Sequence, residues 1–130
     1  MGTVLTVGAV GEASVAVAAD NTAERFGNKG AAVFATPLLV ALMEQAAIAA
    51  IGPYLDAGQG SVGTRVEVSH LAATPVGMTV RARAELTEIA GKKLTFAVEA
   101  YDDREKVGEG RHERYIIDNA KFMARVAAKK

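Results

Sequence analysis

The stretch TPLLVALMEQAAIAAIGP, residues 36–53, is the most regular part of this sequence of 130 residues. Thr36 is a good helix N-cap, because its side-chain oxygen can accept a hydrogen bond from a free amide of the first turn. Pro37 follows at the first helical position, where no N–H is needed, and Gly52 and Pro53 end the helix. Nearly every residue between them is apolar, which predicts a helix buried in the core. At about 15 residues this helix is too short to cross a bilayer comfortably.

On both sides of the helix the sequence alternates between apolar and polar residues, as expected for strands with one buried face. Before the helix, one loosely alternating strand is predicted at residues 4–17. After it, strands are predicted around residues 66–68 and at 79–89, 94–100 and 107–117, with turns at 91–93 and 102–106. The tail, residues 119–130, predicts a short amphipathic helix with Phe122, Met123 and Val126 facing inward.

One strand, one buried helix and about four strands joined by short turns indicate an α+β protein with an antiparallel sheet. A lone helix that is apolar on all sides needs cover on more than one side, and a curved sheet wrapped around it provides that cover. This arrangement is a hot-dog fold. Its edge strands carry unpaired backbone groups, so we expect a homodimer, with higher assembly left open. We find no repeat or linker and expect a single domain over residues 1–130.

The composition argues against several kinds of site and partner. There is no cysteine, and His70 and His112 are the only histidines, so disulfides, thiolate chemistry and a metal site are not expected. The 15 basic residues balance the 15 acidic ones, which argues against nucleic-acid binding. The sequence has neither a signal-peptide pattern nor a long apolar run, so we expect a cytoplasmic protein that does not bind a membrane.

Charge is nevertheless uneven along the chain, with a net charge of −3 over residues 1–80 and +3 over residues 81–130. The simpler interpretation is a set of solvated strand faces. The alternative is a basic rim that binds an anionic ligand such as a phosphorylated cofactor.

Glu44 is a single carboxylate in the middle of the apolar helix. An unpaired buried carboxylate is energetically unfavourable, so its position needs an explanation. Either Glu44 lies beside Gln45 on a thin exposed strip, or it is held in a cleft where it can act as a base, a nucleophile or an orienting group.

Thr36, besides capping the helix, lies where free amides and the positive end of the helix dipole can stabilise an oxyanion. On an ideal helix Thr36 and Glu44 are about 12 Å apart along the axis and about 80° apart around it. A site that uses both residues therefore needs a third group between them, from this chain or another one.

The two histidines each allow two interpretations. His70 follows the strand around residues 66–68 and is either structural or, with Thr36 and Glu44, part of a Thr–His–Glu set. His112 and Arg114 share one face of the last strand, which is either an exposed charged edge or a clamp for a phosphate or carboxylate.

Seven short stretches together resemble the hot-dog thioesterases and, within them, the fluoroacetyl-CoA thioesterase-like family. They are VFAT (33–36), LME (42–44), PYL (53–55), GSVGT (60–64), VSHLAATP (68–75), GMTV (77–80) and GRHER (110–114). The resemblance covers about residues 33–122, and its most specific parts are the F-A-T, M-E and H-x-A-A-T-P motifs.

This resemblance implies a hot-dog dimer with its active sites at the subunit interface. It implies that Thr36, Glu44 and His70 are the catalytic residues. These are the three residues that their chemistry had already singled out.

The resemblance also implies a set of substrate-binding residues. Gly63 and Thr64 would position the thioester carbonyl, Arg114 would lie near the acyl pocket, and Phe34 belongs to the F-A-T motif. No cofactor is implied, because coenzyme A is part of the substrate.

One departure bears on specificity. The fluoroacetate-specific enzyme of the family has a phenylalanine that helps to gate the acyl pocket a few residues before the threonine. The equivalent position here falls on or near Gly30. The sequence therefore favours a small or medium acyl-CoA rather than a fluorinated one.

The leading hypothesis is hydrolysis of such an acyl-CoA, with Glu44 attacking the carbonyl or activating water. Two alternatives are an acyl-CoA-binding protein without hydrolysis and a hydratase or dehydratase of acyl thioesters. Candidates for binding the CoA phosphates are Arg81, Arg83, Lys92, Lys93 and the C-terminal lysines.

Overall fold

The structure, a computed structural model, describes residues 4–130. Its strands are β1 (Val10–Ala16), β2 (Gln59–His70), β3 (Thr79–Ala90), β4 (Lys93–Tyr101) and β5 (Lys106–Asp118), and its α-helices are α1 (Thr36–Ile51) and α2 (Asn119–Ala127). Short 3-10 turns occur at Ala19–Asn21, Ala23–Phe26 and Gly52–Tyr54. The predicted first strand is thus shorter than expected, and the one around residues 66–68 is longer.

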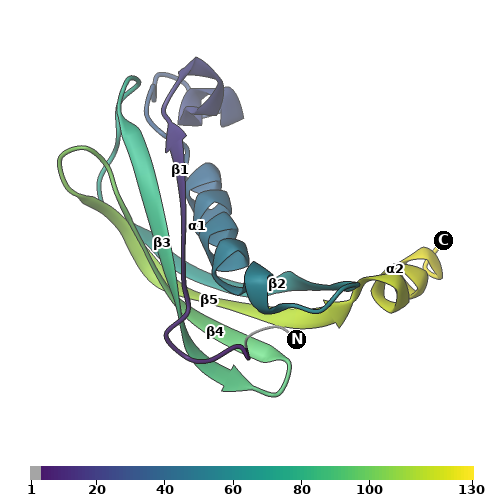
Figure 1. Cartoon of the computed structure of the whole chain (residues 1–130). Coiled ribbons are helices and arrows are strands. Elements are labelled where there is room, and N and C mark those ends of the chain that lie inside the picture. The colour runs from purple at the N-terminus through teal and green to yellow at the C-terminus, as the bar shows by residue number, and fades with distance from the viewer. Residues whose placement is uncertain (1–3) are drawn as a thin grey trace.

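The strands form one antiparallel sheet in the order β1-β3-β4-β5-β2. The sheet curls around α1, as Figure 1 shows. This confirms the predicted hot-dog arrangement. The two edges are β1 and β2, and β2 directly follows α1 and its 3-10 turn. The residues near the end of α1 and those along β2 are therefore brought to the same side of the molecule.

The start of α1 differs in detail from the prediction. Ala35 is the N-cap residue, Thr36 is the first helical residue and Pro37 the second. No side chain caps the helix, because the N-cap residue Ala35 has no polar side chain, and the Thr36 hydroxyl bonds to His70. The helix ends at Ile51, directly before Gly52 and Pro53, as predicted.

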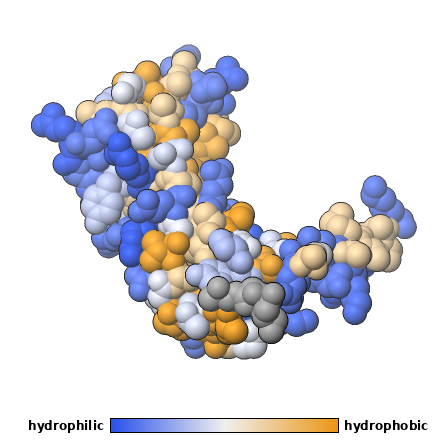
Figure 2. All heavy atoms as spheres, viewed as in Figure 1, coloured by the Kyte–Doolittle hydropathy of each residue, from blue (hydrophilic) through white to orange (hydrophobic). Residues whose placement is uncertain are grey.

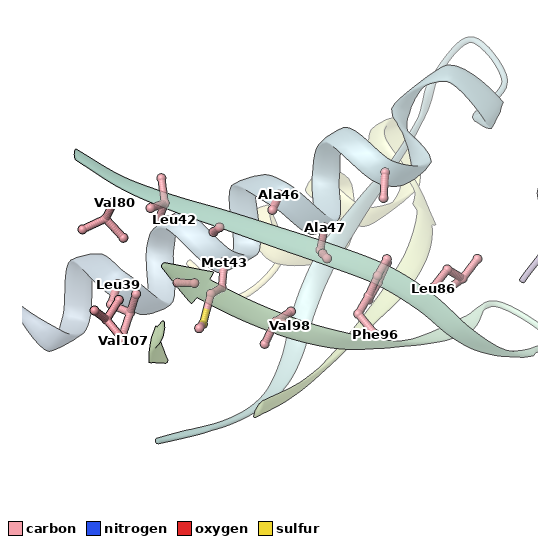
Figure 3. Close-up of a cluster of buried hydrophobic side chains, with 14 of the residues drawn as sticks. Leu39, Leu42, Met43, Ala46, Ala47, Val80, Leu86, Phe96, Val98 and Val107 are labelled. Atoms are coloured by element: carbon pink, nitrogen blue, oxygen red, sulfur yellow. The ribbon is translucent and has the colours of Figure 1, made fainter. Parts of the chain in front are cut away.

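The core lies between α1 and the concave face of the sheet (Figure 3). Met43 and Leu39 of α1 belong to the same cluster of buried side chains as Phe96 and Val98 of β4. At Gly11 the strand β1 runs so close to α1 that a Cβ would overlap the helix backbone, so only glycine fits there.

The helix is not covered all round, although its sequence is apolar all round. Seven of its residues are buried, but Ile48 is 47% exposed, and Gln45 and Ala49 beside it are exposed as well. The sheet covers one side of α1 and leaves the other open.

By length and composition alone, the helical segment Thr36–Tyr54 could cross a membrane. This segment is longer than the predicted helix, because it includes the 3-10 turn Gly52–Tyr54 after α1. In this fold the segment is the central helix of the sheet, and its core-facing residues contact strands rather than lipid.

The predicted C-terminal helix forms, but its apolar residues do not face inward. Met123 is 57% exposed and Val126 is 41% exposed, and only Phe122 is half-buried. Figures 1 and 2 show why, since α2 stands out from the sheet as an arm beyond the end of β5. The arm therefore has little of the chain to pack against.

Candidate active site

The first cluster of polar groups joins the start of α1 to the end of β2. The Thr36 hydroxyl lies 2.6 Å from Nδ1 of His70, within a short hydrogen bond. Thr36 is in the first turn of the helix, where backbone N–H groups have no partner within the helix. His70 is the last residue of β2. The tertiary fold thus places a hydroxyl, an imidazole and a helix N-terminus together.

The environment of His70 keeps its ring neutral. Burial lowers the pKa of His70 below the usual value, and a backbone hydrogen bond at Ala72 only partly opposes this. Its Nε2 is buried and has no hydrogen-bond partner within residues 4–130. A buried polar atom without a partner is uncommon, and this one lies on the ring that Thr36 holds in place.

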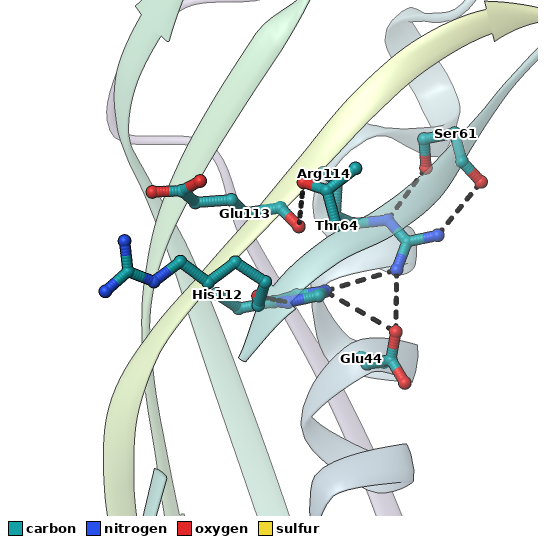
Figure 4. A network of polar contacts seen from close by, with 7 residues as sticks. Glu44, Ser61, Thr64, His112, Glu113 and Arg114 are labelled. Carbon is teal, nitrogen blue, oxygen red and sulfur yellow. Dashed lines mark hydrogen bonds and ion pairs between the residues drawn. The ribbon is translucent and has the colours of Figure 1, made fainter. Parts of the chain in front are cut away.

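The second cluster surrounds Glu44 (Figure 4). Arg114 of β5 donates from Nη1 to Oε2 of Glu44 at 3.3 Å and contacts Nε2 of His112 at 3.2 Å. Glu44 Oε2 is 3.8 Å from the same His112 nitrogen. The Glu44 side chain is 36% exposed, whereas His112 is 1% exposed. Glu44 therefore lies at the mouth of a polar niche, paired on one side and open on the other.

The rest of the Arg114 guanidinium is held by Ser61 of β2. Its Nε donates to the Ser61 hydroxyl at 2.8 Å, and Nη2 donates to the Ser61 carbonyl at 2.9 Å. Burial lowers the pKa of Arg114, and the charge of Glu44 opposes this, so the guanidinium stays charged. A buried cation held by so many groups is a rigid partner for Glu44.

His112 is held in one orientation by its other nitrogen. Nδ1 donates to the backbone carbonyl of Arg65 at 2.8 Å, which leaves the Nε2 lone pair facing Arg114 and Glu44. Burial lowers the pKa of His112, and the charge of Arg114 lowers it further. A neutral ring here can accept a hydrogen bond from Arg114, which a protonated ring could not do.

The two clusters are separate within one chain. Among residues 4–130, Glu44 bonds to Arg114 and approaches His112, and it has no bond to Thr36 or His70. This agrees with the ideal-helix geometry, which places Thr36 and Glu44 two turns apart. The expected three-residue set therefore divides into a Thr36–His70 pair and a Glu44 cluster.

The expected substrate-binding residues Gly63, Thr64 and Phe34 also lie in different places and do not form one cluster. Gly63 lies against Glu44, since a Cβ added to it would be 2.5 Å from Oε2. Thr64 donates its hydroxyl to the Glu113 carbonyl of the neighbouring strand β5. Phe34 is buried and lines a cavity of about 160 Å³ with Leu38 and other residues between β1 and α1.

The structure adds Ser61, which the sequence did not single out, and decides between the two interpretations of His112 and Arg114. Ser61 holds Arg114, and the buried pair of His112 and Arg114 is a niche for Glu44 rather than an exposed edge. The alternation of β5 predicted that His112 and Arg114 share one face of the sheet. It did not show whether that face is the buried or the exposed one. The register shift in β2 between Gly63 and Arg65 is a local irregularity with no clear signal in sequence.

A further buried pair supports the segment after His70. The Thr74 hydroxyl donates to Asp102 at 2.9 Å, and the Thr74 carbonyl accepts from the N–H of Phe34. Burial raises the pKa of Asp102, but the hydrogen bonds from the Arg104 N–H and other donors outweigh it and hold the pKa below its usual value. This pair ties the β4–β5 turn to the chain just before Thr36 and just after His70.

Within residues 4–130, no three His, Asp or Glu side chains gather in a way that could hold a metal ion.

Comparison with known proteins supports one family. Residues 17–120 match the family of fluoroacetyl-CoA-specific thioesterases, FlK. The fluoroacetyl-CoA thioesterase of Streptantibioticus cattleyicolor is 47% identical over 97 residues, which are 75% of this chain and 70% of that protein. A solved structure of FlK, 38% identical, superposes with a TM-score of 0.89 over 97% of this chain and 98% of that one.

A thioesterase superfamily member from Thermus thermophilus is 32% identical and superposes with a TM-score of 0.87, over 95% of this chain and 91% of that one. Variants of FlK have been solved with acetyl-CoA and with fluoroacetate and CoA. Both the sequence match and the superposition cover most of the chain, including the Thr36, Glu44 and His70 segments. The chain therefore belongs to the fluoroacetyl-CoA-specific thioesterase family and is a thioester hydrolase with a hot-dog fold.

Proposed function

We propose that this protein hydrolyses acyl-CoA thioesters with small or medium acyl groups, at a site built from two copies of the chain. The observation that carries the proposal is the Thr36–His70 pair at the start of α1, in which His70 Nε2 is buried without a partner. Two turns further along the same helix, Glu44 is held by Arg114. Thr36 and His70 of one copy act with Glu44 of the partner subunit. The comparisons support a thioesterase, and the division of roles is our inference.

Exposed surfaces support the two-copy site. The open side of α1 carries Ile48 and Gln45, and β2 is an edge strand on which Val66 is 40% exposed. Edge strands and exposed apolar side chains are typical of surfaces that bind another chain. A two-fold axis beside β2 would bring the end of one β2 towards the middle of the other, and so His70 of one chain towards the Glu44 cluster of its partner.

In this proposal Thr36 and His70 handle protons and the oxyanion. The helix N-terminus and the Thr36 hydroxyl stabilise negative charge as it develops on the thioester oxygen. The neutral His70 ring holds the Thr36 hydroxyl through Nδ1 and exchanges protons with it as the reaction proceeds.

Glu44 completes the reaction by one of two routes. As a general base it takes a proton from water, and the water oxygen forms the new bond to the carbonyl carbon. As a nucleophile it forms that bond itself, and water then cleaves the resulting anhydride. In both routes the C–S bond breaks, the thiolate of CoA is protonated, and the products are a carboxylic acid and free CoA. Arg114 and His112 keep the carboxylate in position.

The proposed acyl size follows from the loop before α1. Gly30 lies in an exposed turn with a φ of 85°, where a bulky gating side chain is absent. FlK variants bind acetyl-CoA as well as fluoroacetate with CoA, so acetyl-CoA is the first substrate to test. We further propose that the reaction needs no cofactor and that the protein acts as a cytoplasmic homodimer.

The test is thiol release from acetyl-, propionyl-, butyryl- and hexanoyl-CoA, followed with a thiol-reactive dye. Glu44→Gln and His70→Gln are expected to lose at least about 10²-fold in kcat, and Glu88→Gln, the same change at an exposed position of β3, is the matched control. Release that all variants retain would contradict the assigned site. Binding of acyl-CoA without any release would instead indicate a binding protein.

A further inference from the structure

Ser61 and Glu44 contact the guanidinium of Arg114 from two different sides, as Figure 4 shows. Arg114 lies directly opposite Gly63 in the β2–β5 ladder, and a Cβ on Gly63 would be 3.4 Å from Nη1. Because side chains two positions apart on a strand share a face, Ser61 lies just beyond Gly63, where the guanidinium ends. Nε donates to the Ser61 hydroxyl at 2.8 Å, and Nη2 donates to the Ser61 carbonyl at 2.9 Å. Ser61 therefore occupies the edge of the guanidinium that Nε and Nη2 form.

This edge is one through which an arginine can bind both oxygens of a carboxylate. Such bidentate pairs use two parallel N–H groups and are the strong ones. Glu44 is held only by Nη1, at 3.3 Å, and Nη1 also contacts His112. Within residues 4–130, the contacts of Glu44 with Arg114 and His112 are all made by Oε2. The other oxygen, Oε1, is therefore left for water or substrate.

The burial of Arg114 decides what would follow if the Ser61 hydroxyl were removed. Arg114 is 4% exposed, and a buried N–H group without an acceptor is unfavourable. Glu44 is the one carboxylate within residues 4–130 that forms an ion pair with Arg114. Without the hydroxyl, the guanidinium is expected to turn its freed edge towards Glu44 and bind both carboxylate oxygens. Oε1 would then no longer be available for the reaction.

We propose that Ser61 is a positioning residue that prevents Arg114 from binding both oxygens of Glu44. It acts through Arg114 and needs no contact with the substrate. Its effect on hydrolysis rests on the proposed function, in which Glu44 is the base or the nucleophile. The arrangement of Ser61, Arg114 and Glu44 does not rest on that function.

The kinetic test compares two substitutions of Ser61. Ser61→Ala is expected to lower kcat for acetyl-CoA about tenfold at unchanged KM, because it displaces a reacting group and removes no contact with the substrate. Ser61→Thr keeps the hydroxyl, and the added methyl group has room in the cavity of about 460 Å³ that Ser61 lines at the end of α1. Its kcat should stay within about threefold of the wild type.

The matched control is Ser14→Ala, the same change at an exposed position of β1, the opposite edge strand of the sheet. A Ser61→Ala variant as active as this control would overturn the proposal. A Ser61→Thr variant as impaired as Ser61→Ala would also overturn it, because the loss would then come from packing rather than from the hydroxyl.

A double-variant cycle shows whether Ser61 acts through Arg114. Arg114→Lys keeps the positive charge but removes the planar fork, so no Nε remains for the hydroxyl to bind. Adding Ser61→Ala to Arg114→Lys should change kcat by less than about twofold. A tenfold loss in both backgrounds would give Ser61 a role independent of Arg114 and would overturn the proposal.

A measurement without substrate separates this inference from the proposed function. The Nε–H of Arg114 gives a resonance in a proton–nitrogen correlation NMR spectrum, which is assigned by its loss in Arg114→Lys. Ser61→Ala should shift this resonance, and the shift should change when Glu44→Gln is added, because the turned guanidinium then loses its charged acceptor. An equal shift in both backgrounds would show that Arg114 does not turn towards Glu44 and would overturn the proposal. A shift that depends on Glu44, in a protein that releases no thiol, would contradict the proposed function and keep the role of Ser61.

Discussion

The hydroxyl of Thr36 lies 2.6 Å from Nδ1 of His70, although the two residues are 34 positions apart in the sequence. The bond joins the first turn of α1 to the last residue of β2. It uses the hydroxyl that the sequence predicted as a helix cap. The structure begins the helix one residue earlier than that, with Ala35 as the N-cap, so the Thr36 side chain is free to bond to His70.

The Thr36–His70 pair is expected to act as a unit. Thr36→Val removes the hydroxyl at similar volume and should lower kcat by about 10²-fold, while Thr36→Ser keeps the hydroxyl and should stay within about threefold of the wild type. Combining Thr36→Val with His70→Gln should be little worse than either change alone. Steady-state kinetics with acetyl-CoA measures this, and losses that multiply would show that the residues act independently.

Mixed dimers test whether the site is shared between chains. Thr36→Val and Glu44→Gln are each expected to lose about 10²-fold or more in kcat alone. If Thr36 of one copy works with Glu44 of the partner subunit, a refolded equimolar mixture contains heterodimers with one intact site. The mixture should then regain about a quarter of the wild-type sites. The measurement is kcat after mixing and refolding, and a mixture as inactive as its components would place each site within one chain.

Gly63 is expected to be needed at the Glu44 niche. A Cβ there would be 2.5 Å from Glu44 Oε2 and 3.2 Å from His112 Cε1, so Gly63→Ala must displace the carboxylate. We expect kcat to fall by about 10-fold or more, because small misplacements of reacting groups are costly. The control is Gly60→Ala on the same strand, where the three atoms nearest to the new Cβ all belong to the end of the Asn119 side chain. Circular dichroism should show both variants folded, and equal kinetics in the two would contradict the role of Gly63.

The buried histidines predict a loss of stability in mild acid. Burial lowers the pKa values of His70 and His112 below 6.5 in the folded protein, so the unfolded chain binds protons at higher pH than the folded one. The free energy of unfolding should therefore decrease as pH falls below about 6.5, until the folded-state pKa values are reached. Urea titrations between pH 7.5 and 5 measure this.

The matched variant for that measurement is His112→Gln, which removes one titrating group from the core. The slope of the unfolding free energy against pH below 6.5 should become shallower than in the wild type, whatever the absolute stability of the variant. An unchanged slope would show that His112 titrates alike in both states. Asp102, whose pKa is held below 3.8, contributes only in a lower pH range.

The Thr74–Asp102 bond is expected to stabilise two segments, the one that follows His70 and the one that contains Phe34. Thr74 is fully buried and Asp102 nearly so, hence Thr74→Val leaves a buried carboxylate with one donor fewer. We expect a loss of about 1–3 kcal/mol in the free energy of unfolding. Asp103→Ala removes the adjacent, exposed carboxylate and should change it by less than about 1 kcal/mol. Urea unfolding of both variants decides this, and equal losses would contradict a special role for the buried pair.

The sequence alone was enough to predict most of the secondary structure. The helix at residues 36–51, its end at Gly52 and Pro53, and the strands after it follow from periodicity and local stop signals, which depend only on neighbours in the chain. The same local patterns placed Glu44 in mid-helix and His112 and Arg114 on one strand face. The family motifs added the thioesterase class, which the comparisons confirm.

Only the tertiary structure decided how these residues meet. The partners of Thr36 and Arg114 come from segments far away in the sequence, and a short-range pattern carries no information about such contacts. It also decided that α2 stands out as an arm, because an amphipathic pattern shows which residues are apolar but not whether a surface lies opposite them. Strand register and the curl of the sheet bring Glu44, Arg114 and His112 into one niche, and both depend on packing across the whole fold.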